Sequence, residues 1–221
     1  MPLLVDLHLH CRNRRMKFVE RPLLPPFTAV IRRAIELNLG AIAITNHDLL
    51  DEDIVAVAEN YRDKIIFIPS EEITTRDGHL LAYGIKKEIR SGLSALETIN
   101  LIHEQGGAAI AAHPFWWGFS LKEKVFSLPL DGLEVFNASI SRGQNEKSLA
   151  AAKKMKLATT GGSDAHFSSF VGYGLSVFNE GIKNYEEIIA AIRNRAVGYQ
   201  GKSYTKIEEL RAFFRERIIS K

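Results

Sequence analysis

The sequence predicts a protein of the α/β class that folds as a single-domain, distorted, TIM-like barrel. Short apolar segments alternate with segments of helical periodicity along the chain. The apolar segments are continuous rather than alternating, which is typical of parallel strands covered by helices on both faces. Polar residues follow at least five of these segments. In a barrel the carboxyl ends of all strands converge on one face, whereas in an open sheet distant strands cannot share a site.

Seven apolar segments are expected to be strands, so the barrel is expected to be of the (β/α)7 kind. They are residues 3–9, 41–45, 65–73, 80–85, 108–112, 133–136 and 157–160. Helices are expected at residues 27–38, 51–61, 94–105, 146–155, 185–193 and 205–219. The helices at 94 and 205 open with the Ser/Thr-x-x-Glu pattern of a capping box. The long stretch 11–26 has no clear helical pattern, which is why we expect a distorted barrel.

The composition is that of an ordinary globular protein. Of the 221 residues, 46% are hydrophobic and 25% charged, and the net charge of +3 is too small to indicate nucleic-acid or membrane binding by itself. The single cysteine, Cys11, excludes an internal disulfide and fits a reducing compartment. With no signal-peptide pattern and no apolar stretch that could span a bilayer, a cytoplasmic protein is expected. No composition shift marks a second domain, so we expect one domain over residues 1–221, with 205–221 as a C-terminal helix packed on it.

Six of the seven histidines lie in short polar clusters at the ends of the expected strands. His8 and His10 are two residues apart in a strand and therefore point to the same side, as do Asp164 and His166. Imidazole and carboxylate groups gathered from many strand ends are what a multi-metal hydrolytic site requires. The seventh histidine, His103, falls near the C-terminus of an expected helix and is better explained as a cation there than as a ligand. The candidate ligands are His8, His10, His47, Glu72, His79, His113, Asp164 and His166.

Glu71 and Glu72 are adjacent in an expected strand, so only one of them can point into the site. A central carboxylate can bridge two metals roughly 3.5–4 Å apart. The other glutamate is expected to form a salt bridge or face solvent. Asp6 is expected to orient a ligand histidine through a hydrogen bond.

Taken in order, the clusters resemble the PHP family (polymerase and histidinol phosphatase domain). That family has an HxH strand, a second-strand His, a Glu, a His, an HP pair and a terminal DxH. Here these positions read DLHLH, TNHD, SEEIT, DGH, AHP and GGSDAH. The resemblance runs from Asp6 to His166 and implies a distorted seven-stranded barrel with two or three divalent metal ions, for which the mixed ligands suit Zn, Mn or Fe.

The resemblance also implies which residues hold each metal. The first would be held by His8, His10, Glu72 and Asp164, the second by Glu72, His79 and His113, and the third by His47 and His166. Glu72 is preferred over Glu71 because the family's Glu is followed directly by an aliphatic residue, here Ile73. The third site lacks the family's usual Asp or His after the HxH strand, and Glu20 either replaces it or pairs with a neighbouring arginine. That metal is therefore weak, absent or held through Glu20. Asn46 also stands where the family usually has Asp.

Metals in such a site make bound water acidic and neutralise charge on a phosphoryl group. The predicted function is a metal-dependent phosphoesterase, in which a metal-bound hydroxide attacks a phosphomonoester or phosphodiester of a small molecule such as a nucleotide. Asp164 and His166 are the candidates for moving protons. Arginine suits phosphate geometry, and Trp116 could stack on a nucleobase or sugar. The candidate substrate-binding residues are Arg12, Arg14, Arg15, Arg142 and Trp116. A solvated surface remains the alternative for the loop arginines, and a cap on the core for Trp116.

Two other functions fit the same pattern less well. One is a nuclease acting on nucleic-acid ends, which some PHP members are, although this chain has no polymerase domain and no extended basic face. The other is a non-catalytic RNA-binding barrel, like those related to ribonuclease P protein components. A scaffold would have no reason to keep His8, Glu72 and Asp164 together. A small phosphorylated substrate is therefore favoured over nucleic acid, and no membrane partner is expected.

Overall fold

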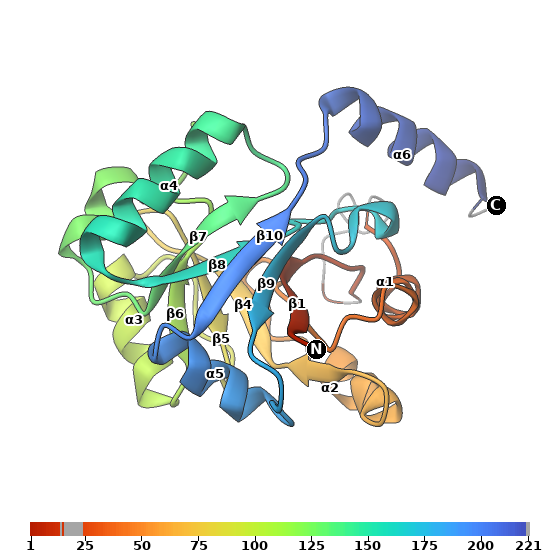
Figure 1. Cartoon of the computed structure of the whole chain (residues 1–221), viewed down its shortest axis with the longest axis horizontal. Helices are drawn as coiled ribbons and strands as arrows, with labels where there is room; N and C mark the ends of the chain where they lie inside the picture. The colour runs from red at the N-terminus through yellow and green to blue at the C-terminus, as the bar shows by residue number, and fades with distance from the viewer. Residues whose placement is uncertain (14, 16–23, 220–221) are drawn as a thin grey trace.

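The computed structural model describes residues 1–13, 15 and 24–219 (Figure 1). In these residues ten strands form two five-stranded sheets, with the orders β10-β9-β1-β2-β3 and β4-β5-β6-β7-β8. The strands of the first sheet are β1 (Leu3–Leu9), β2 (Ala41–Ile44), β3 (Ile66–Ile68), β9 (Gly174–Phe178) and β10 (Val197–Gly201). Those of the second are β4 (Ser70–Thr74), β5 (His79–Tyr83), β6 (Ala108–Ala111), β7 (Gly132–Asn137) and β8 (Ala158–Gly162).

Most of the helices lie on the outside of these sheets, as Figure 1 shows. Each of the six expected helices is present, with ends that differ by a few residues. They are α1 (Phe27–Glu36), α2 (Glu52–Ala58), α3 (Ala95–Glu104), α4 (Arg142–Met155), α5 (Tyr185–Arg193) and α6 (Lys206–Ile219). Three short 3-10 helices, η2 (Glu59–Tyr61), η3 (Lys122–Ser127) and η4 (Ser168–Phe170), were not expected. The Ser94 side chain accepts from the Glu97 amide and Glu97 accepts from the Ser94 amide, so the capping box of α3 is formed.

The prediction of a mixed α/β fold is confirmed, but a closed seven-stranded barrel is not found in the described residues. Four strand pairs are antiparallel: β1 with β9, β9 with β10, β4 with β5, and β5 with β6. The turn between β4 and β5 is too short for a parallel crossover, so that pair has to be a hairpin. The expected strand 65–73 is divided at Pro69, which has no amide hydrogen for a sheet ladder.

The two sheets meet on the side where the polar clusters lie. An isolated parallel bridge joins His47, after β2, to Glu72 in β4, and another joins Leu9 in β1 to Ala165, after β8. The amide of Asp48 donates to the carbonyl of Glu72 at 2.9 Å, and the amide of Asp164 donates to the carbonyl of His8 at 2.8 Å. These backbone bonds hold four strand ends in fixed register around one site.

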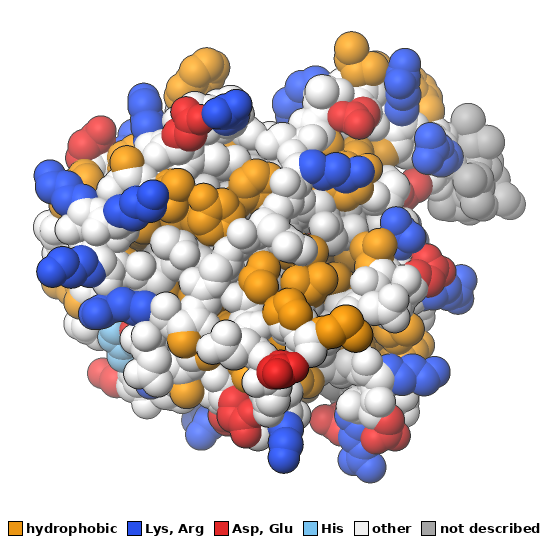
Figure 2. Space-filling model, in the orientation of Figure 1, with side chains coloured by type: hydrophobic (Ala, Val, Ile, Leu, Met, Phe, Trp, Pro, Cys, Tyr) orange, Lys and Arg blue, Asp and Glu red, His pale blue; other side chains and the backbone are white. Residues whose placement is uncertain are grey.

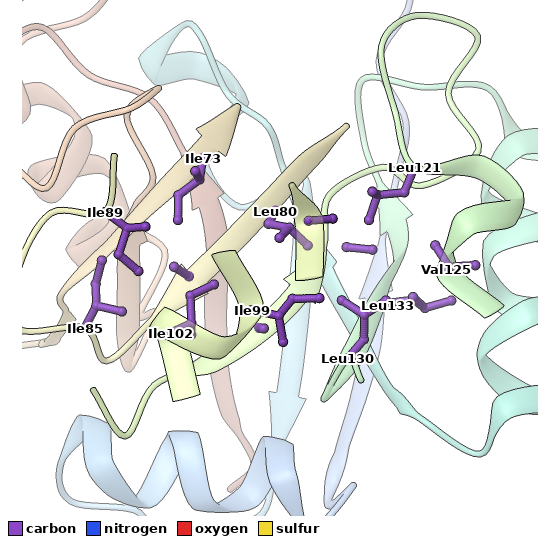
Figure 3. Close-up of a cluster of buried hydrophobic side chains, with 14 of the residues drawn as sticks. Ile73, Leu80, Ile85, Ile89, Ile99, Ile102, Leu121, Val125, Leu130 and Leu133 are labelled. Carbon is purple, nitrogen blue, oxygen red and sulfur yellow. The ribbon is translucent and has the colours of Figure 1, made fainter. Parts of the chain in front are cut away.

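Buried apolar clusters on both sides of each sheet make the strand ends rigid. Figure 3 shows the cluster in which Ile99 and Ile102 of α3 and Val125 of η3 pack with Leu80 of β5 and Leu133 of β7. A second cluster lies between the sheets and α5, and there the buried Tyr83 hydroxyl donates to the carbonyl of Leu7 at 2.8 Å. Burial at this density limits how far the site residues can move.

The C-terminal helix α6 lies apart from the sheets, at the upper right of Figure 1. Two contacts fix it to the segment after β8. Ala212 is buried, and the Glu216 carboxylate accepts from the amides of Ser168 and Ser169 at 3.1 and 3.0 Å. That residues 1–221 form one domain, with 205–221 as its packed C-terminal helix, stays a prediction.

The surface carries charges of both signs. Figure 2 shows lysine and arginine side chains interspersed with aspartate and glutamate on the face it presents. Among the described residues, no helix is long and apolar enough to cross a membrane.

Glu71 corrects one expectation, because it neither forms a salt bridge nor faces solvent. Its side chain is buried, Oε1 accepts from the Ile89 amide at 2.8 Å, and Oε2 has no partner. Burial raises the pKa of Glu71 from its ordinary value of 4.5 to about 8; the Ile89 amide opposes this shift, and nearby Glu88 adds to it.

We expect Glu71→Gln to stabilise the protein in a pH-dependent way. Below about pH 4.5 the carboxyl is protonated in both the folded and the unfolded chain, so Gln changes little. Between pH 4.5 and 8 the unfolded chain releases the proton first, which destabilises the fold of the natural protein but not of the variant. The expected gain in the free energy of unfolding is about 2–4 kcal/mol at pH 8. Urea unfolding at pH 4.5 and pH 8 measures it, and an equal difference at both pH values would contradict this account.

Candidate metal centre

The eight predicted ligands lie around one point at the end of the two sheets. His8 lies in β1 and His10 directly after it, His47 follows β2, and Glu72 and His79 lie in the β4–β5 hairpin. His113 follows β6, and Asp164 and His166 follow β8. His8, His10 and Glu72 are fully buried, whereas His47 and His166 have side chains about half exposed, at 47% and 43%. The cluster therefore has a closed floor and an open side.

The carboxylate of Glu72 is at the centre of five histidines. Its Oε2 lies 3.2 Å from Nε2 of His8, 3.4 Å from Nε2 of His10 and 3.3 Å from Nδ1 of His47. Its Oε1 lies 3.2 Å from Nδ1 of His79 and 3.0 Å from Nε2 of His113. Each oxygen thus faces a different group of nitrogens, which is the arrangement of a carboxylate that can bridge two cations.

The charges around Glu72 shift the pKa values of the cluster strongly. Burial raises the pKa of Glu72, but the neighbouring His47 and His8 lower it by more, so the pKa lies well below its usual range. Burial lowers the pKa of His8, but Glu134, Asp164 and Glu72 raise it by more. Burial and the neighbouring His166 lower the pKa of His10 to about 3, so this imidazole is neutral and has a free lone pair.

Within the part of the chain that the structure describes, four sets of three side chains place their ligand atoms within 4.8 Å of one another. One holds His8, His10 and Glu72, and a second holds Glu72, His79 and His113. The others are His8 with His113 and Asp164, and His10 with His47 and His166. His10 thus belongs to two sets, and its ring nitrogen is a possible third ligand for a cation bound by His47 and His166.

The unpaired nitrogens of the cluster test whether a metal fits there. Among the described residues, both ring nitrogens of His10, Nδ1 of His79 and Nδ1 of His113 are buried and form no hydrogen bond of acceptable geometry, although carboxylate oxygens lie 3.2–3.4 Å from Nε2 of His10 and Nδ1 of His79. A buried polar atom without a partner is costly. Coordination of divalent cations would satisfy these nitrogens, and the set of nitrogen and carboxylate donors suits Zn, Mn or Fe.

Asp164 is oriented by side chains that the sequence did not single out. Its Oδ2 accepts from the Ser139 hydroxyl at 2.9 Å and from the Asn137 amide at 3.2 Å. This directs Oδ1 toward Nε2 of His10 and of His8, at 3.3 and 3.5 Å. Asp164 and His113 both have positive φ angles, of 51° and 29°, which non-glycine residues adopt rarely and mainly at functional sites.

Glu134 is a further residue that sequence reasoning missed. It is buried in β7, where Oε1 lies 2.9 Å from Nδ1 of His8 and Oε2 accepts from the His113 amide at 2.7 Å. Donation from Nδ1–H to Glu134 fixes the His8 ring with Nε2 facing Glu72 and Asp164, where a bound cation would take the Nε2 lone pair. The sequence does contain a signal for Glu134. A carboxylate in the otherwise apolar run Leu-Glu-Val-Phe is unexpected unless it has a polar partner.

We expect Glu134→Gln to weaken metal binding while leaving the fold intact. Gln can still accept one hydrogen bond from His8, but it removes the negative charge that makes this imidazole a good ligand. The expected loss in metal affinity is about 10–100-fold. Titration with a competing chelator measures it, and circular dichroism checks the fold. Unchanged metal affinity would show that Glu134 has only a structural role.

Asp6 does not orient a histidine ring, contrary to expectation. Its Oδ1 accepts from the amides of Ser163 and His8 at 3.0 and 3.3 Å, and its Oδ2 accepts from the Gly172 amide at 2.8 Å. Burial raises the pKa of Asp6 to about 6, although these backbone amides oppose the shift. Asp6 therefore ties β1 to the loops after β8 and acts on the backbone of the site.

The candidate substrate-binding residues are less concentrated than the ligands. Trp116 lines the pocket above the histidines, and Arg142 borders an adjoining cavity, where it pairs with Glu146 at 2.7 Å. Arg15 pairs with Glu88 at 2.9 Å, and Arg12 is exposed; neither lines the pocket. Arg14 and Glu20 lie outside the described residues.

The pocket over the cluster has a volume of about 430 Å³ and receives residues from α6 that were not foreseen. Lys206, Glu209 and Phe213 of α6 line it together with Tyr204 and Phe167. Their positions depend on how the C-terminal helix folds back, which no local pattern in residues 205–219 indicates.

Comparison with known proteins places this geometry in a family. The chain is 32% identical over 143 residues to the uncharacterized protein MJ1587 of Methanocaldococcus jannaschii, a match that spans 60% of this chain and 81% of that protein. The PHP-associated family model matches residues 142–197. The fold is similar to a two-domain protein of Bacteroides vulgatus containing a predicted PHP-like metal-dependent phosphoesterase, with a TM-score of 0.71, 18% identity, and coverage of 97% of this chain and 70% of that one. The chain belongs to the PHP family.

Another PHP-like fold shows how widely this architecture is used. The lesion-specific endonuclease PfuEndoQ of Pyrococcus furiosus matches with a TM-score of 0.63 and 20% identity, over 88% of this chain and 56% of that one. At such identities the likeness is one of fold. The reaction of this PHP chain must therefore be inferred from its own residues.

Proposed function

We propose that this PHP chain hydrolyses phosphoester bonds of a small phosphorylated molecule with the help of two or three divalent metal ions. The observation that supports this most is Glu72, whose two oxygens face five histidine nitrogens at 3.0–3.4 Å. No structural purpose explains why His8, His10 and Glu72 are fully buried side by side, because burying ionisable groups costs stability.

The ligand sets fit three metal positions. His8, His10, Glu72 and Asp164 would hold the first, and Glu72, His79 and His113 the second. His47 and His166 would hold the third, and His10 lies close enough to complete it without an acidic residue from the segment 11–20. Divalent metals at these positions would lower the pKa of water and neutralise charge on the phosphoryl oxygens.

The protein side chains have three tasks in this reaction. Glu72 and Asp164 supply the negative charge that fixes the cations, and Glu134 holds the His8 ring with its Nε2 lone pair directed inward. His166 is half exposed at the open side, with Nδ1 held 3.0 Å from the Asp164 carbonyl oxygen. In a site of two metals its Nε2 would bind no cation and could pass a proton to the leaving group, whereas in a site of three metals it would be a ligand. Of the candidate substrate-binding residues that the structure describes, Trp116 lines the pocket and could contact the rest of the substrate, and Arg142 borders the adjoining cavity.

A nucleic-acid substrate is the second candidate, because PfuEndoQ shares the fold and is an endonuclease. The small net charge of +3 and the mixed surface of Figure 2 favour the small molecule. A nuclease should cleave oligonucleotides faster than mononucleotides, and its binding should weaken steeply with salt.

The experiment is metal analysis of the purified full chain, followed by assays on phosphorylated metabolites, dinucleotides and oligonucleotides with Mn or Zn. We expect at least two metal ions per chain and hydrolysis that a chelator stops. A protein without stoichiometric metal, or one in which His8→Ala keeps full activity and an intact fold, would exclude the proposed site.

A further inference from the structure

We propose that the pocket binds an apolar, ring-sized leaving group beside the metal centre, so that the preferred substrates are phosphoesters of apolar or aromatic alcohols. This inference rests on the proposed function, because it names the substrate class of the same site.

The pocket has two chemically different walls. One consists of the metal-centre residues His47, His79, His113, Asp164 and His166. The other consists of apolar side chains that come from separate parts of the chain: Leu24, Trp116, Ile140, Phe167 and Phe213. A phosphoester whose phosphate lies at the histidines would therefore place its alcohol portion against carbon atoms.

Trp116 is held in place as part of the apolar wall. Its amide donates to the His113 carbonyl at 2.9 Å, its carbonyl accepts from the Ser120 hydroxyl at 2.8 Å, and its ring lies 5.5 Å from the His113 ring. A Cβ at Gly118 would overlap the indole ring, so the absence of a side chain there leaves space for it. The indole is thus oriented before any ligand binds, which limits the entropy lost on binding.

Phe213 is held from the opposite side by the attachment of α6. Its ring makes an edge-to-face contact with Phe167, with centroids 6.4 Å apart. The neighbouring Ala212 is buried, and Glu216 accepts two backbone amides of η4. These contacts fix the face of α6 that carries Phe213 toward the pocket.

The polar groups of the pocket outside the metal ligands already have partners. The Ser139 hydroxyl lies 2.7 Å from Oδ1 of Asn137 and 2.9 Å from Oδ2 of Asp164, and the Tyr204 hydroxyl donates to the Asp164 carbonyl at 3.2 Å. Lys206 pairs with Glu209 at 2.8 Å. These bonds engage the hydroxyl protons of Ser139 and Tyr204, so a polyhydroxylated leaving group such as glycerol would find few free donors there, whereas an apolar ring needs none.

The chain supplies two matched controls for this wall. Phe214 follows Phe213 in the same helix but is 56% exposed, and Trp117 follows Trp116 in the same loop but is 83% exposed. Neither Phe214 nor Trp117 lines the pocket. Within each pair, one Ala substitution removes an aromatic side chain that lines the proposed subsite, and the other removes the same kind of side chain outside it.

The test measures binding of 2-phenylethylphosphonate and ethylphosphonate to the Mn-loaded full chain by calorimetry. Both probes resist hydrolysis, and they share the phosphonate and differ in the ring. We expect the phenylethyl compound to bind roughly 10–100-fold more tightly, as burial of one ring predicts. Phe213→Ala and Trp116→Ala should each reduce this ratio several-fold, while Phe214→Ala and Trp117→Ala should leave it unchanged.

Equal binding of the two phosphonates, or no binding of either, would overturn the proposal. An equal decrease in the ratio of the two affinities in Phe213→Ala and Phe214→Ala would also overturn it. If Phe213→Ala does not fold, Trp116→Ala and Trp117→Ala decide the question. The failure of the proposed function would look different. If the protein binds the phenylethyl compound more tightly but hydrolyses no phosphoester, the apolar subsite is supported and the proposed hydrolase function is not. Conversely, equal kcat/KM for 2-phenylethyl and ethyl phosphate, whose alcohols are similarly good leaving groups, would retain the hydrolase and remove the subsite.

Discussion

Glu72→Gln is expected to abolish hydrolysis and to remove at least one metal ion per chain. Gln has nearly the same volume, but it replaces a carboxylate oxygen with an NH2 group that cannot bind a cation. It also leaves five histidine nitrogens facing a neutral group. Loss of one partner from a buried charged cluster costs about 3–5 kcal/mol, which corresponds to a loss of about 150- to 5,000-fold in metal affinity at the bridged positions.

The adjacent Glu71 provides the control for this prediction. Glu71 and Glu72 are both buried in β4, but the Glu71 carboxylate accepts from the Ile89 amide and belongs to none of the ligand sets of the described residues. Glu71→Gln should therefore keep its metal ions and activity while gaining stability. Elemental analysis of both purified variants measures the difference. Retention of all metal ions by Glu72→Gln would contradict its role as the bridge.

His10→Ala is expected to lose one more metal ion per chain than His47→Ala. His10 belongs to two ligand sets, one with His8 and Glu72 and one with His47 and His166, whereas His47 belongs only to the second. Removal of His10 therefore weakens two positions, and removal of His47 weakens one. Elemental analysis after dialysis against a weak chelator gives the number of metal ions per chain in each variant.

His103→Ala is the control for this pair. That histidine lies in α3 and bonds to Asp131 at 2.8 Å, away from the ligand sets, so its removal should leave the metal content unchanged. If His10→Ala and His47→Ala lose the same number of ions while their thermal unfolding stays cooperative, His10 serves only one position.

The strand-end histidines could be located from the sequence because the period of a strand is two residues. His8 and His10, like Asp164 and His166, were placed on one side of the chain by that period alone, and the structure brings both pairs to the same cluster. The six helices were predictable from their 3.6-residue periodicity and capping boxes. The strands β9 and β10 were not, because the glycines of Gly174–Phe178 and Val197–Gly201 give a weak strand signal.

Contacts between distant segments were beyond local patterns. Glu134 reaches His8 across 126 residues, and Glu216 reaches Ser168 across 48. A sequence shows that a carboxylate is in an apolar run, but it does not show which group the carboxylate meets. The antiparallel pairing of β1 with β9 could not be inferred either, because β9 has a weak strand signal, whereas the short turn between β4 and β5 already requires a hairpin.

The sequence by itself determined the chemistry of this protein: the number and kind of ligand side chains, their spacing on strands, and the family to which those clusters belong. Periodicity and side-chain chemistry are local properties, so they can be read without a fold. Only the tertiary structure decided how the strands pair into two sheets, which carboxylate supports His8, and that α6 brings Phe213 to the pocket. These depend on packing between segments far apart in the chain, where the free energy of burial, rather than local preference, selects the partner.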